Sequence, residues 1–447
     1  MRTPRRNATM GLDAHARETL MPKRLLCALI IVTLLNGCAP HVPTPTPTPV
    51  PAPATSLEQR IQRVEAGLVP MSEDGQIAWG QSAALADRLA HYGVPGVGVA
   101  VIRDYQIDWA KGYGVLQVGG SEPVTAQTLF HAGSIAKPLS AAATLTLVEQ
   151  GLLDLDGDVN AKLTSWQMPE NEHTTVEKVT LRRLMSHSSG IQDGFTNRSS
   201  SDALPSYFRP EGEALTVTLQ QLLDGDPSVD VDGPTFVATV PGTSYNYANA
   251  NYAILELLVE DVIQTPFATF MAEAVLKPLG LTSMTYQQPM PVNLRARAAT
   301  QHGVNGQPLP GKRLIAPFTA AGGMWTTPSD LARIAIEIMR AYGGDSGRFI
   351  SPQMARQMLT PQVEVVDGPL AAIADAVGLG FDLADEDGRL RMSMTGGTWG
   401  STCVLWAFPE AGDGAVVMTN SARGTMLNFE VLLGLSTEYG WLAEQGS

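Results

Sequence analysis

Apolar residues along this chain recur with two spacings, one typical of helices and one typical of strands. Residues 81–92 have helical spacing. Two strands joined by a turn at 103–105 follow, at 96–102 and 106–113. Strand-like segments return only near the other end of the chain, at 379–383, 389–394, 403–408 and 415–419. The pattern therefore predicts strands at both ends of the folded part.

The middle of the chain predicts helices and loops. Helical spacing occurs at 181–187, 215–223, 252–263 and 331–342, and a last helix is predicted at 426–441. Strands at both ends with helices between them predict an α+β fold, in which helices flank one mainly antiparallel sheet built from both chain ends. The helical middle, roughly 155–330, would form a second lobe. We expect a ligand to bind in the cleft between the lobes.

The N-terminal pattern is typical of an export signal. Lys23 and Arg24 precede the apolar run 25–35, which is shorter than the roughly 20 residues that span a bilayer. The ending Leu-Asn-Gly-Cys resembles a bacterial lipoprotein signal, so residues 1–37 would be removed and Cys38 lipidated. A transmembrane anchor is the alternative, which the length of the run disfavours. Met21 is a second possible start.

A proline-rich stretch follows Cys38. Alternating prolines in 39–56 favour an extended spacer, so we predict a lipidated N-terminus and spacer at 38–74 and a catalytic domain at 75–447. The expected location is the bacterial cell envelope, facing the periplasm and attached to the membrane by the lipid. Ala39 after the lipidated cysteine favours the outer membrane.

Composition narrows the possible partners. The chain has 447 residues and a net charge of −14. Cleavage before Cys38 would remove six basic and two acidic residues and leave 24 basic against 42 acidic, or −18, with no basic cluster, so nucleic acid is a poor partner. Of three cysteines, Cys27 lies in the signal and Cys38 would carry lipid, so Cys403 is left without an intramolecular disulfide partner. Asp154, Asp156, Asp158 and Asn160 are spaced as in a calcium loop, but the glycine and closing glutamate of such a loop are missing. The sequence predicts a helix-exit loop there, and neither a metal site nor a cofactor.

The first candidate for chemistry is Ser134 with Lys137. An apolar run at 139–148 closed by Gly151 predicts a helix, and positions three apart share a helix face. The Lys137 amine would therefore lie beside the Ser134 hydroxyl, where a desolvated lysine can take its proton. The alternative is an ordinary buried helix start with a surface lysine.

Two loops are further candidates. In 241–249, Tyr247 and Asn249 can project together: a phenol whose pKa is lowered by a lysine can act as a base, and an amide can hold a substrate carbonyl. The alternative for Asn249 is a cap of the following helix. In 394–400, glycines at a strand end let a ligand approach the backbone, and the alternative is a hairpin turn.

Six segments in this order resemble the class C β-lactamase-related family of penicillin-recognising serine hydrolases, which includes D-alanyl-D-alanine carboxypeptidases and lactamase-like esterases. They are 130–141 (FHAGSIAKPLSA), 181–190 (LRRLMSHSSG), 241–249 (PGTSYNYAN), 277–286 (KPLGLTSMTY), 320–332 (AAGGMWTTPSDLA) and 395–400 (TGGTWG). The resemblance implies a β-lactamase/transpeptidase-like fold and an acyl-enzyme mechanism.

The resemblance also assigns roles. Ser134 would be the acylated nucleophile, Lys137 its activator and Tyr247 the base or proton shuttle, while His187 would be structural. Substrate-binding and oxyanion positions would be Asn249, Thr395, Gly396 and Gly397, with the backbone N–H groups of Ser134 and Gly397 forming the oxyanion hole.

One position departs from the family pattern. Met394 stands where lysine or histidine usually precedes Thr395 and Gly396, and Arg391 would face the other side of the strand. β-Lactams and D-Ala-D-Ala peptides carry a carboxylate that this cation would bind. We therefore expect a neutral ester or amide substrate, with a β-lactam or peptidoglycan-like peptide as less favoured substrates. A catalytically weak relative that binds cell-wall peptide or a partner protein in the same cleft is the alternative.

Overall fold

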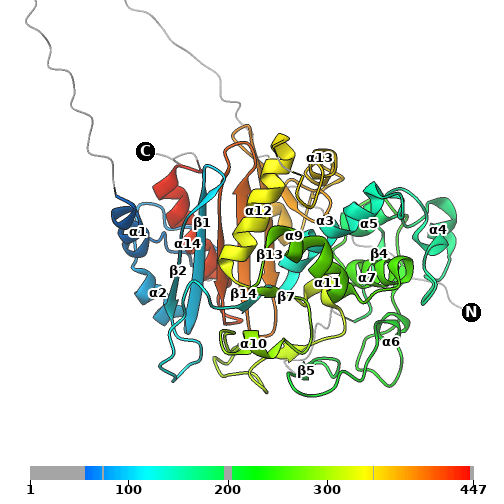
Figure 1. Ribbon diagram of the computed structural model, residues 1–447, viewed down its shortest axis with the longest axis horizontal. Helices are drawn as coiled ribbons and strands as arrows, with labels where there is room; N and C mark the ends of the chain where they lie inside the picture. Colours follow the sequence, from blue (N-terminus) through cyan, green and yellow to red (C-terminus); the bar gives the residue numbers. More distant parts are fainter. Residues whose placement is uncertain (1–55, 73–74, 196–203, 346, 443–447) are drawn as a thin grey trace, which may run out of the picture. The chain divides into compact units, whose positions relative to one another are not determined.

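One eight-stranded antiparallel sheet dominates the computed structural model, which describes residues 56–72, 75–195, 204–345 and 347–442 (Figure 1). Its strand order is β10-β11-β12-β13-β14-β15-β1-β2. In that order the strands are Val363–Glu364, Ala376–Val377, Asp382–Glu386, Arg389–Gly397, Thr402–Phe408, Asp413–Thr419, Gly96–Arg103 and Gln106–Gly114. Strand β1 pairs with β15, so the sheet is assembled from both chain ends, as predicted. The strand expected at 379–383 instead begins at Asp382.

Helices cover both faces of the sheet. Helices α3 (Ala136–Glu149) and α12 (Pro328–Gly343) lie on one face, and α14 (Thr425–Tyr439) lies on the other (Figure 1). Alternation along β1 divides its side chains between two apolar clusters. Ala100 and Ile102 join the cluster around α3, whereas Val97, Val99 and Val101 join the one around α14. A sheet buried on both faces explains why β1 is apolar at almost every position.

The folded part begins earlier than the sequence prediction placed it. Helix α1 (Leu57–Ala66) starts at a capping box formed by Ser56 and Gln59, and its Val64 packs in the α14 cluster. Helix α2 (Leu85–Tyr92) follows, starting later than the predicted residue 81. The predicted spacer boundary at 74 is therefore wrong, because residues from Ser56 belong to the fold. The predicted signal and Cys38 lie outside the described residues.

The middle of the chain forms the predicted helical lobe. Its helices are α4 (Glu172–Val176), α5 (Leu181–Met185), α6 (Leu219–Asp224), α7 (Ala250–Ile263), α8 (Phe267–Met271), α9 (Lys277–Leu279), α10 (Val292–Arg295) and α11 (Thr319–Gly322). Helix α13 (Pro352–Met358) follows α12. Helix α6 starts at Leu219 rather than residue 215, because the Thr218 side chain caps it there. In the described part of the chain, no helix combines the length and apolar character needed to cross a bilayer.

Short strands in and beside this lobe were not predicted. The three sheets are β3-β9-β7 (Phe130–His131, Trp325–Thr326, Met284–Thr285), β4-β6 (Ile191–Gln192, Phe236–Val237) and β5-β8 (Arg209–Pro210, Leu314–Ile315). Each strand has two residues, which is too short for an alternating pattern to be recognised. The β3-β9 pair places the segment that leads into Ser134 beside the segment that leads into α12.

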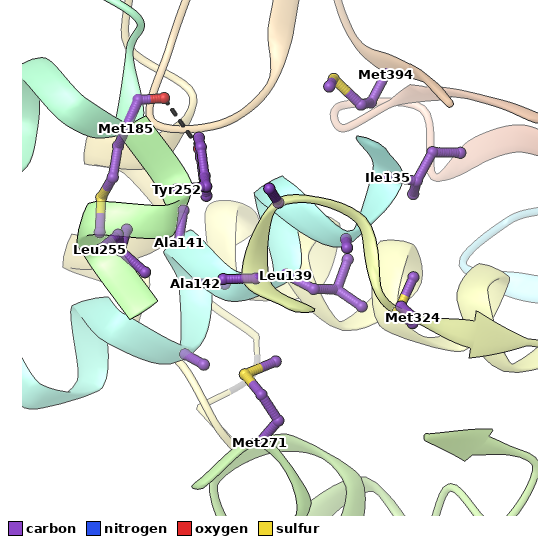
Figure 2. Close-up of a cluster of buried hydrophobic side chains, with 14 of the residues drawn as sticks. Ile135, Leu139, Ala141, Ala142, Met185, Tyr252, Leu255, Met271, Met324 and Met394 are labelled. Carbon is purple, nitrogen blue, oxygen red and sulfur yellow. Dashed lines mark hydrogen bonds between the residues drawn. The ribbon is translucent and has the colours of Figure 1, made fainter. Parts of the chain in front are cut away.

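Helix α3 is the apolar centre of the molecule. It is buried around almost its whole circumference, as expected for a helix that lies between a sheet and other helices. Figure 2 shows Leu139, Ala141 and Ala142 of α3 among side chains from α7 and more distant segments. In the same cluster, the Tyr252 hydroxyl donates to the carbonyl of Met185 at 3.0 Å. Lys137 is carried on this buried helix, so its amine is held away from water.

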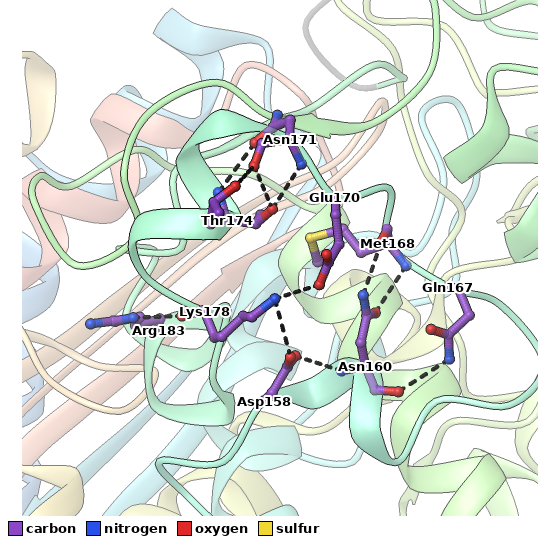
Figure 3. Close-up of polar contacts among 10 residues, drawn as sticks. Asp158, Asn160, Gln167, Met168, Glu170, Asn171, Thr174, Lys178 and Arg183 are labelled. Carbon is purple, nitrogen blue, oxygen red and sulfur yellow. Dashed lines mark hydrogen bonds and ion pairs between the residues drawn. The ribbon is translucent and has the colours of Figure 1, made fainter.

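The acidic segment after α3 forms a loop, as predicted. Asp158 accepts a hydrogen bond from the Asn160 backbone at 3.0 Å, and Lys178 forms ion pairs with Asp158 and Glu170 (Figure 3). The Asn160 side chain exchanges hydrogen bonds with the backbone of Met168. These side chains thus bind neighbouring parts of the chain and fix the loop.

Candidate active site

Ser134 lies in a 3-10 turn, Gly133–Ile135, that runs directly into α3. Gly133 has a φ of +51°, and a Cβ there would come within 2.9 Å of the Gly397 carbonyl oxygen and 3.0 Å of its nitrogen. The missing side chain lets the end of β13 approach the turn. Ser134 and Gly397 consequently line the same cavity, as the prediction of a shared oxyanion hole requires.

Lys137 is fully buried beside Ser134. Its Nζ lies 2.9 Å from Ser134 Oγ, 2.7 Å from Asn249 Oδ1 and 2.7 Å from the Ala321 carbonyl oxygen. The predicted contact between amine and hydroxyl is confirmed, and the surface-lysine alternative is wrong. Burial lowers the pKa of Lys137 to about 7, although the carboxylates of Asp193 and Asp382 act in the opposite direction.

Tyr247 completes the contacts of the serine. Its hydroxyl lies 2.6 Å from Ser134 Oγ, and the Lys137 amine is 4.9 Å from the centre of its ring. Burial raises the pKa of Tyr247, so the lowering that we predicted from a nearby lysine is wrong. The phenol is therefore protonated in the resting site, and Lys137 is the group whose pKa is close to neutrality.

The ring of His187 packs against the ring of Tyr247. The two rings lie 4.5 Å apart, and His187 Nδ1 accepts a hydrogen bond from the backbone N–H of Ala248 at 3.3 Å. Burial and the charge of Lys137 lower the pKa of His187 well below its usual value, so the imidazole is neutral. The ring therefore packs against Tyr247 and binds the loop backbone, as a structural role requires.

Asn249 occupies the cap position of α7 but does not cap it with its side chain. Its amide oxygen accepts a hydrogen bond from Lys137, and Asp193 caps the helix instead. Asp193 accepts hydrogen bonds from the backbone N–H groups of Asn249 at 2.8 Å and Ala250 at 3.3 Å. Sequence analysis missed Asp193, whose only local sign is the Asp-Gly pair that it forms with Gly194.

Glu256 fixes the short helix that supplies the other oxygen contacted by Lys137. The buried carboxyl accepts hydrogen bonds from the Thr319 hydroxyl and the Ala320 backbone N–H, both at 2.7 Å, and so fixes the start of α11. Ala321, whose carbonyl binds Lys137, lies in this short helix. Burial raises the pKa of Glu256 to about 8. This support was not predicted either.

The opposite wall of the site is the end of β13. Gly396 has no room for a side chain, because a Cβ would lie 2.2 Å from the Ala132 carbonyl oxygen and 2.5 Å from Cys403 Sγ. Thr395 and Gly396 do not line the cavity, whereas Gly397 does. Met394 is buried in the α3 cluster (Figure 2). Arg391 lies against the ring of Trp406, which belongs to the α14 cluster, and thus faces the other side of the sheet, as predicted.

Ser134 opens into a cavity of about 440 Å³ that lies between the sheet and the helical lobe. Much of its wall is aromatic or aliphatic, and it includes Tyr207, Phe208, Leu314, Phe318 and Trp399. Apart from the tryptophan in TGGTWG, no pattern in the sequence pointed to these residues. Within the described residues, no three His, Cys, Asp or Glu side chains group together as metal ligands.

Comparisons with known proteins agree with this geometry. The sequence model of the family described as Beta-lactamase matches residues 82–430. Penicillin-binding protein 4 of Amycolatopsis lactamdurans is 29% identical over 346 residues, which cover 76% of this chain and 84% of that protein.

Among solved structures, the octameric penicillin-binding protein homologue from Pyrococcus abyssi has a TM-score of 0.63 and 22% identity, covering 80% of this chain and 76% of that one. The D-amino acid amidase from Ochrobactrum anthropi SV3 has a TM-score of 0.59 and 20% identity, covering 79% and 97%. With a family match over most of its length, this chain belongs to the Beta-lactamase family and is a serine hydrolase of the penicillin-recognising type.

Proposed function

We propose that this protein hydrolyses a neutral ester or amide through an acyl-enzyme on Ser134. The observation that carries the proposal is the set of hydrogen bonds at Ser134 Oγ, which lies 2.9 Å from Lys137 Nζ and 2.6 Å from the Tyr247 hydroxyl. A serine hydroxyl becomes a useful nucleophile when an adjacent group takes its proton. Both neighbours of this hydroxyl can move a proton.

Lys137 is the base in this proposal. Two of its three contacts are with the amide oxygen of Asn249 and the carbonyl oxygen of Ala321, which only accept hydrogen bonds. A neutral amine has two N–H bonds and one lone pair. With both hydrogens directed at those oxygens, the lone pair points to Ser134 Oγ, and a pKa of about 7 makes the neutral form accessible near neutral pH.

The reaction then proceeds in two steps, acylation of Ser134 and hydrolysis of the acyl-enzyme. Ser134 Oγ bonds to the acyl carbon while its proton passes to Lys137, and the oxyanion forms between the backbone N–H groups of Ser134 and Gly397. The alcohol or amine leaves with the proton of the Tyr247 hydroxyl, which Lys137 replaces. Water next attacks the acyl-enzyme, its proton passes through the same groups, and Ser134 and the carboxylic acid are released.

The wall of the cleft opposite Lys137 supports the preference for a neutral substrate. The family's usual cation is replaced by Met394, whose side chain is 5% exposed and packs in the core. Among the described residues that line the cavity, none is lysine or arginine. A substrate carboxylate would lose its hydration there without gaining a charged partner. A carboxylate-bearing β-lactam or peptide therefore suits this cavity less well than a neutral ester or amide.

Export and membrane attachment are also part of the proposal. The short apolar run 25–35, Cys38 and the proline-rich stretch that follows support a lipid-anchored protein of the bacterial cell envelope that faces the periplasm. We expect Cys38→Ala to abolish incorporation of labelled palmitate and to release the protein from the membrane fraction. Equal membrane attachment of the variant would contradict a lipid anchor at this residue.

Labelling of the purified protein tests the catalytic proposal. A fluorophosphonate probe should label the wild type and leave Ser134→Ala unlabelled, and a fluorescent penicillin should label the wild type weakly. If neither probe labels the wild type above the variant, the hydrolytic proposal fails. In that case the cleft would belong to a catalytically weak relative that binds cell-wall peptide or a partner protein.

A further inference from the structure

The cavity beside Ser134 contains a cluster of aromatic rings from three distant segments. Phe208 precedes β5, Phe318 precedes α11 and Trp399 follows β13. Phe208 lies 5.7 Å from Phe318 and 6.3 Å from Trp399, centre to centre, with both pairs edge to face. Tyr207 packs against Phe208 at 5.1 Å and Phe318 at 6.1 Å. These separations are typical of favourable aromatic pairs.

The cluster differs in accessibility from one end to the other. Tyr207 and Phe318 are buried, at 2% and 8% exposure, whereas Phe208 and Trp399 are half-buried. Phe208 and Trp399 therefore retain ring surface that is not covered by protein. Such surface on a cavity wall is a binding site for an apolar group, since contact with it removes apolar area from water.

Charge is absent from the described part of this wall. None of the described lining residues is Lys, Arg, Asp or Glu, and burial lowers the pKa of His131 to about 4, so its ring is neutral. A charged group would enter without a counterion, at a high cost in lost hydration. The wall thus favours groups that are both apolar and neutral.

Two glutamines keep the wall in place. The Gln301 amide oxygen accepts from the Leu314 backbone N–H at 2.8 Å, and its amide nitrogen donates to Thr398 Oγ1 at 3.1 Å. The Gln288 amide oxygen accepts from the Ala316 backbone N–H at 2.8 Å. These bonds connect the segment before α11 with the loop that carries Trp399. A wall held in this way is formed before substrate binds, which reduces the entropy lost on binding.

We propose that the cavity binds the acyl half of the substrate, that this acyl group ends in a phenyl-sized apolar group, and that Phe208 and Trp399 determine this specificity. The inference rests on the proposed function, because it assumes acylation of Ser134. The acyl half is assigned to the cavity because it stays bonded to Ser134 through both steps, whereas the leaving group must escape to solvent. A concave aromatic site suits the part that stays.

The test compares p-nitrophenyl phenylacetate with p-nitrophenyl acetate, which share a leaving group. For the wild type we expect kcat/KM to be at least about 10-fold higher for phenylacetate, in the range that pocket contacts with apolar groups produce. Phe208→Leu and Trp399→Leu should each bring this ratio close to one. Trp79→Ala is the control: Trp79 is 44% exposed and lies outside the cavity, so the ratio should not change.

Three further substrates sharpen the test. p-Nitrophenyl 4-carboxyphenylacetate should react at least about 10-fold more slowly than phenylacetate, because its charge meets an uncharged wall. If 2-phenylethyl acetate is preferred over ethyl phenylacetate, the cavity holds the leaving group and the assignment of the acyl half is overturned.

Fluorophosphonate labelling tests the proposed function separately from the proposed specificity, and it shows that each variant is folded. If Ser134 is labelled and p-nitrophenyl acetate is hydrolysed, but the ratio is near one in the wild type or survives in both aromatic variants, the specificity proposal alone is wrong. If Ser134 is not labelled in the wild type, the proposed function and the specificity that rests on it fail together.

Discussion

The two walls of the catalytic cleft are built by different means. On the α3 side, the polar groups around the serine are paired: Lys137 binds two oxygens and Ser134, and Asp193 and Glu256 bind the backbone of the segments that supply those oxygens. On the β13 side, glycines make close backbone contacts and Met394 is buried among apolar side chains. The wall on the α3 side is held together mainly by hydrogen bonds around the serine, whereas the end of β13 is held in place mainly by close packing.

This difference separates catalysis from recognition. The residues of the hydrogen-bonded wall transfer protons, and the same proton transfers are needed for any ester or amide. The wall of β13 and the aromatic residues beside it decide which substrate fits. A serine hydrolase can therefore change its substrate class on the second wall while the first stays intact, and under the proposed function the replacement of the family's usual cation by methionine is a change of that kind.

The largest effect is expected at Lys137. Lys137→Met keeps the length of the side chain but removes the base, so kcat/KM for p-nitrophenyl acetate should fall about 10³-fold, within the range for general acid–base catalysis. In the wild type, kcat/KM should rise as pH increases through about 7, since the neutral amine is the active form and the pKa of Lys137 is about 7. Lys162→Met, at an exposed position, is the control. A variant that retains a tenth of the activity would show that Lys137 is not the base.

Two adjacent glycines test the wall built by close packing. Gly396→Ala should lower the free energy of unfolding by about 3 kcal/mol, because its Cβ would collide with the Ala132 carbonyl and Cys403 Sγ. Gly397→Ala is the matched control. Nothing lies within 4 Å of its Cβ, so the change should be below about 1 kcal/mol. Urea denaturation measures both, and equal losses would mean that the close contact of Gly396 is not what stabilises this wall.

Met394 tests whether the apolar wall depends on one residue. Met394→His restores a residue type that the family uses, yet the side chain enters an apolar cluster and would stay neutral there. We expect the free energy of unfolding to fall by about 2 kcal/mol and labelling by fluorescent penicillin to stay weak. Met394→Leu, which keeps the core apolar, should cost less. Strong penicillin labelling of Met394→His would show that this position reaches the substrate after all.

Local patterns carried the parts of the site that could be predicted. Ser134 and Lys137 are three residues apart where a 3-10 turn continues into α3, so their contact follows from local helical geometry. The sheet followed from nearly continuous apolar runs in long strands such as β1 and β14. Tyr247, Asn249 and Gly397 lie far away in sequence, and only the resemblance to a family brought them to the same site.

The rest depended on contacts that leave no local pattern. The sequence allowed Asn249 to cap α7 or to face the site, and the choice was made by Asp193, which is 56 positions away and binds the free N–H groups instead. The pKa of Tyr247 depends on how deeply the fold buries it, which outweighs the nearby lysine. At the N-terminus, the capping box of Ser56 and Gln59 was present in the sequence, but it directly follows the prolines and was included in the spacer.

Asp193 acts on the backbone of α7 through hydrogen bonds and on the pKa of Lys137 through its charge. Of the changes considered, its replacement is expected to have the smallest effect. Asp193→Asn keeps an oxygen for the Asn249 N–H but removes a negative charge that raises the pKa of Lys137. The apparent pKa of kcat/KM should therefore move to lower pH, by less than about one unit, which corresponds to less than about 1.4 kcal/mol. Asp108→Asn, whose carboxylate pairs with Arg60, should leave the pH profile unchanged. If Asp193→Asn lowers stability without moving the profile, Asp193 only holds α7 in place, and the charge balance of the catalytic wall depends on other groups.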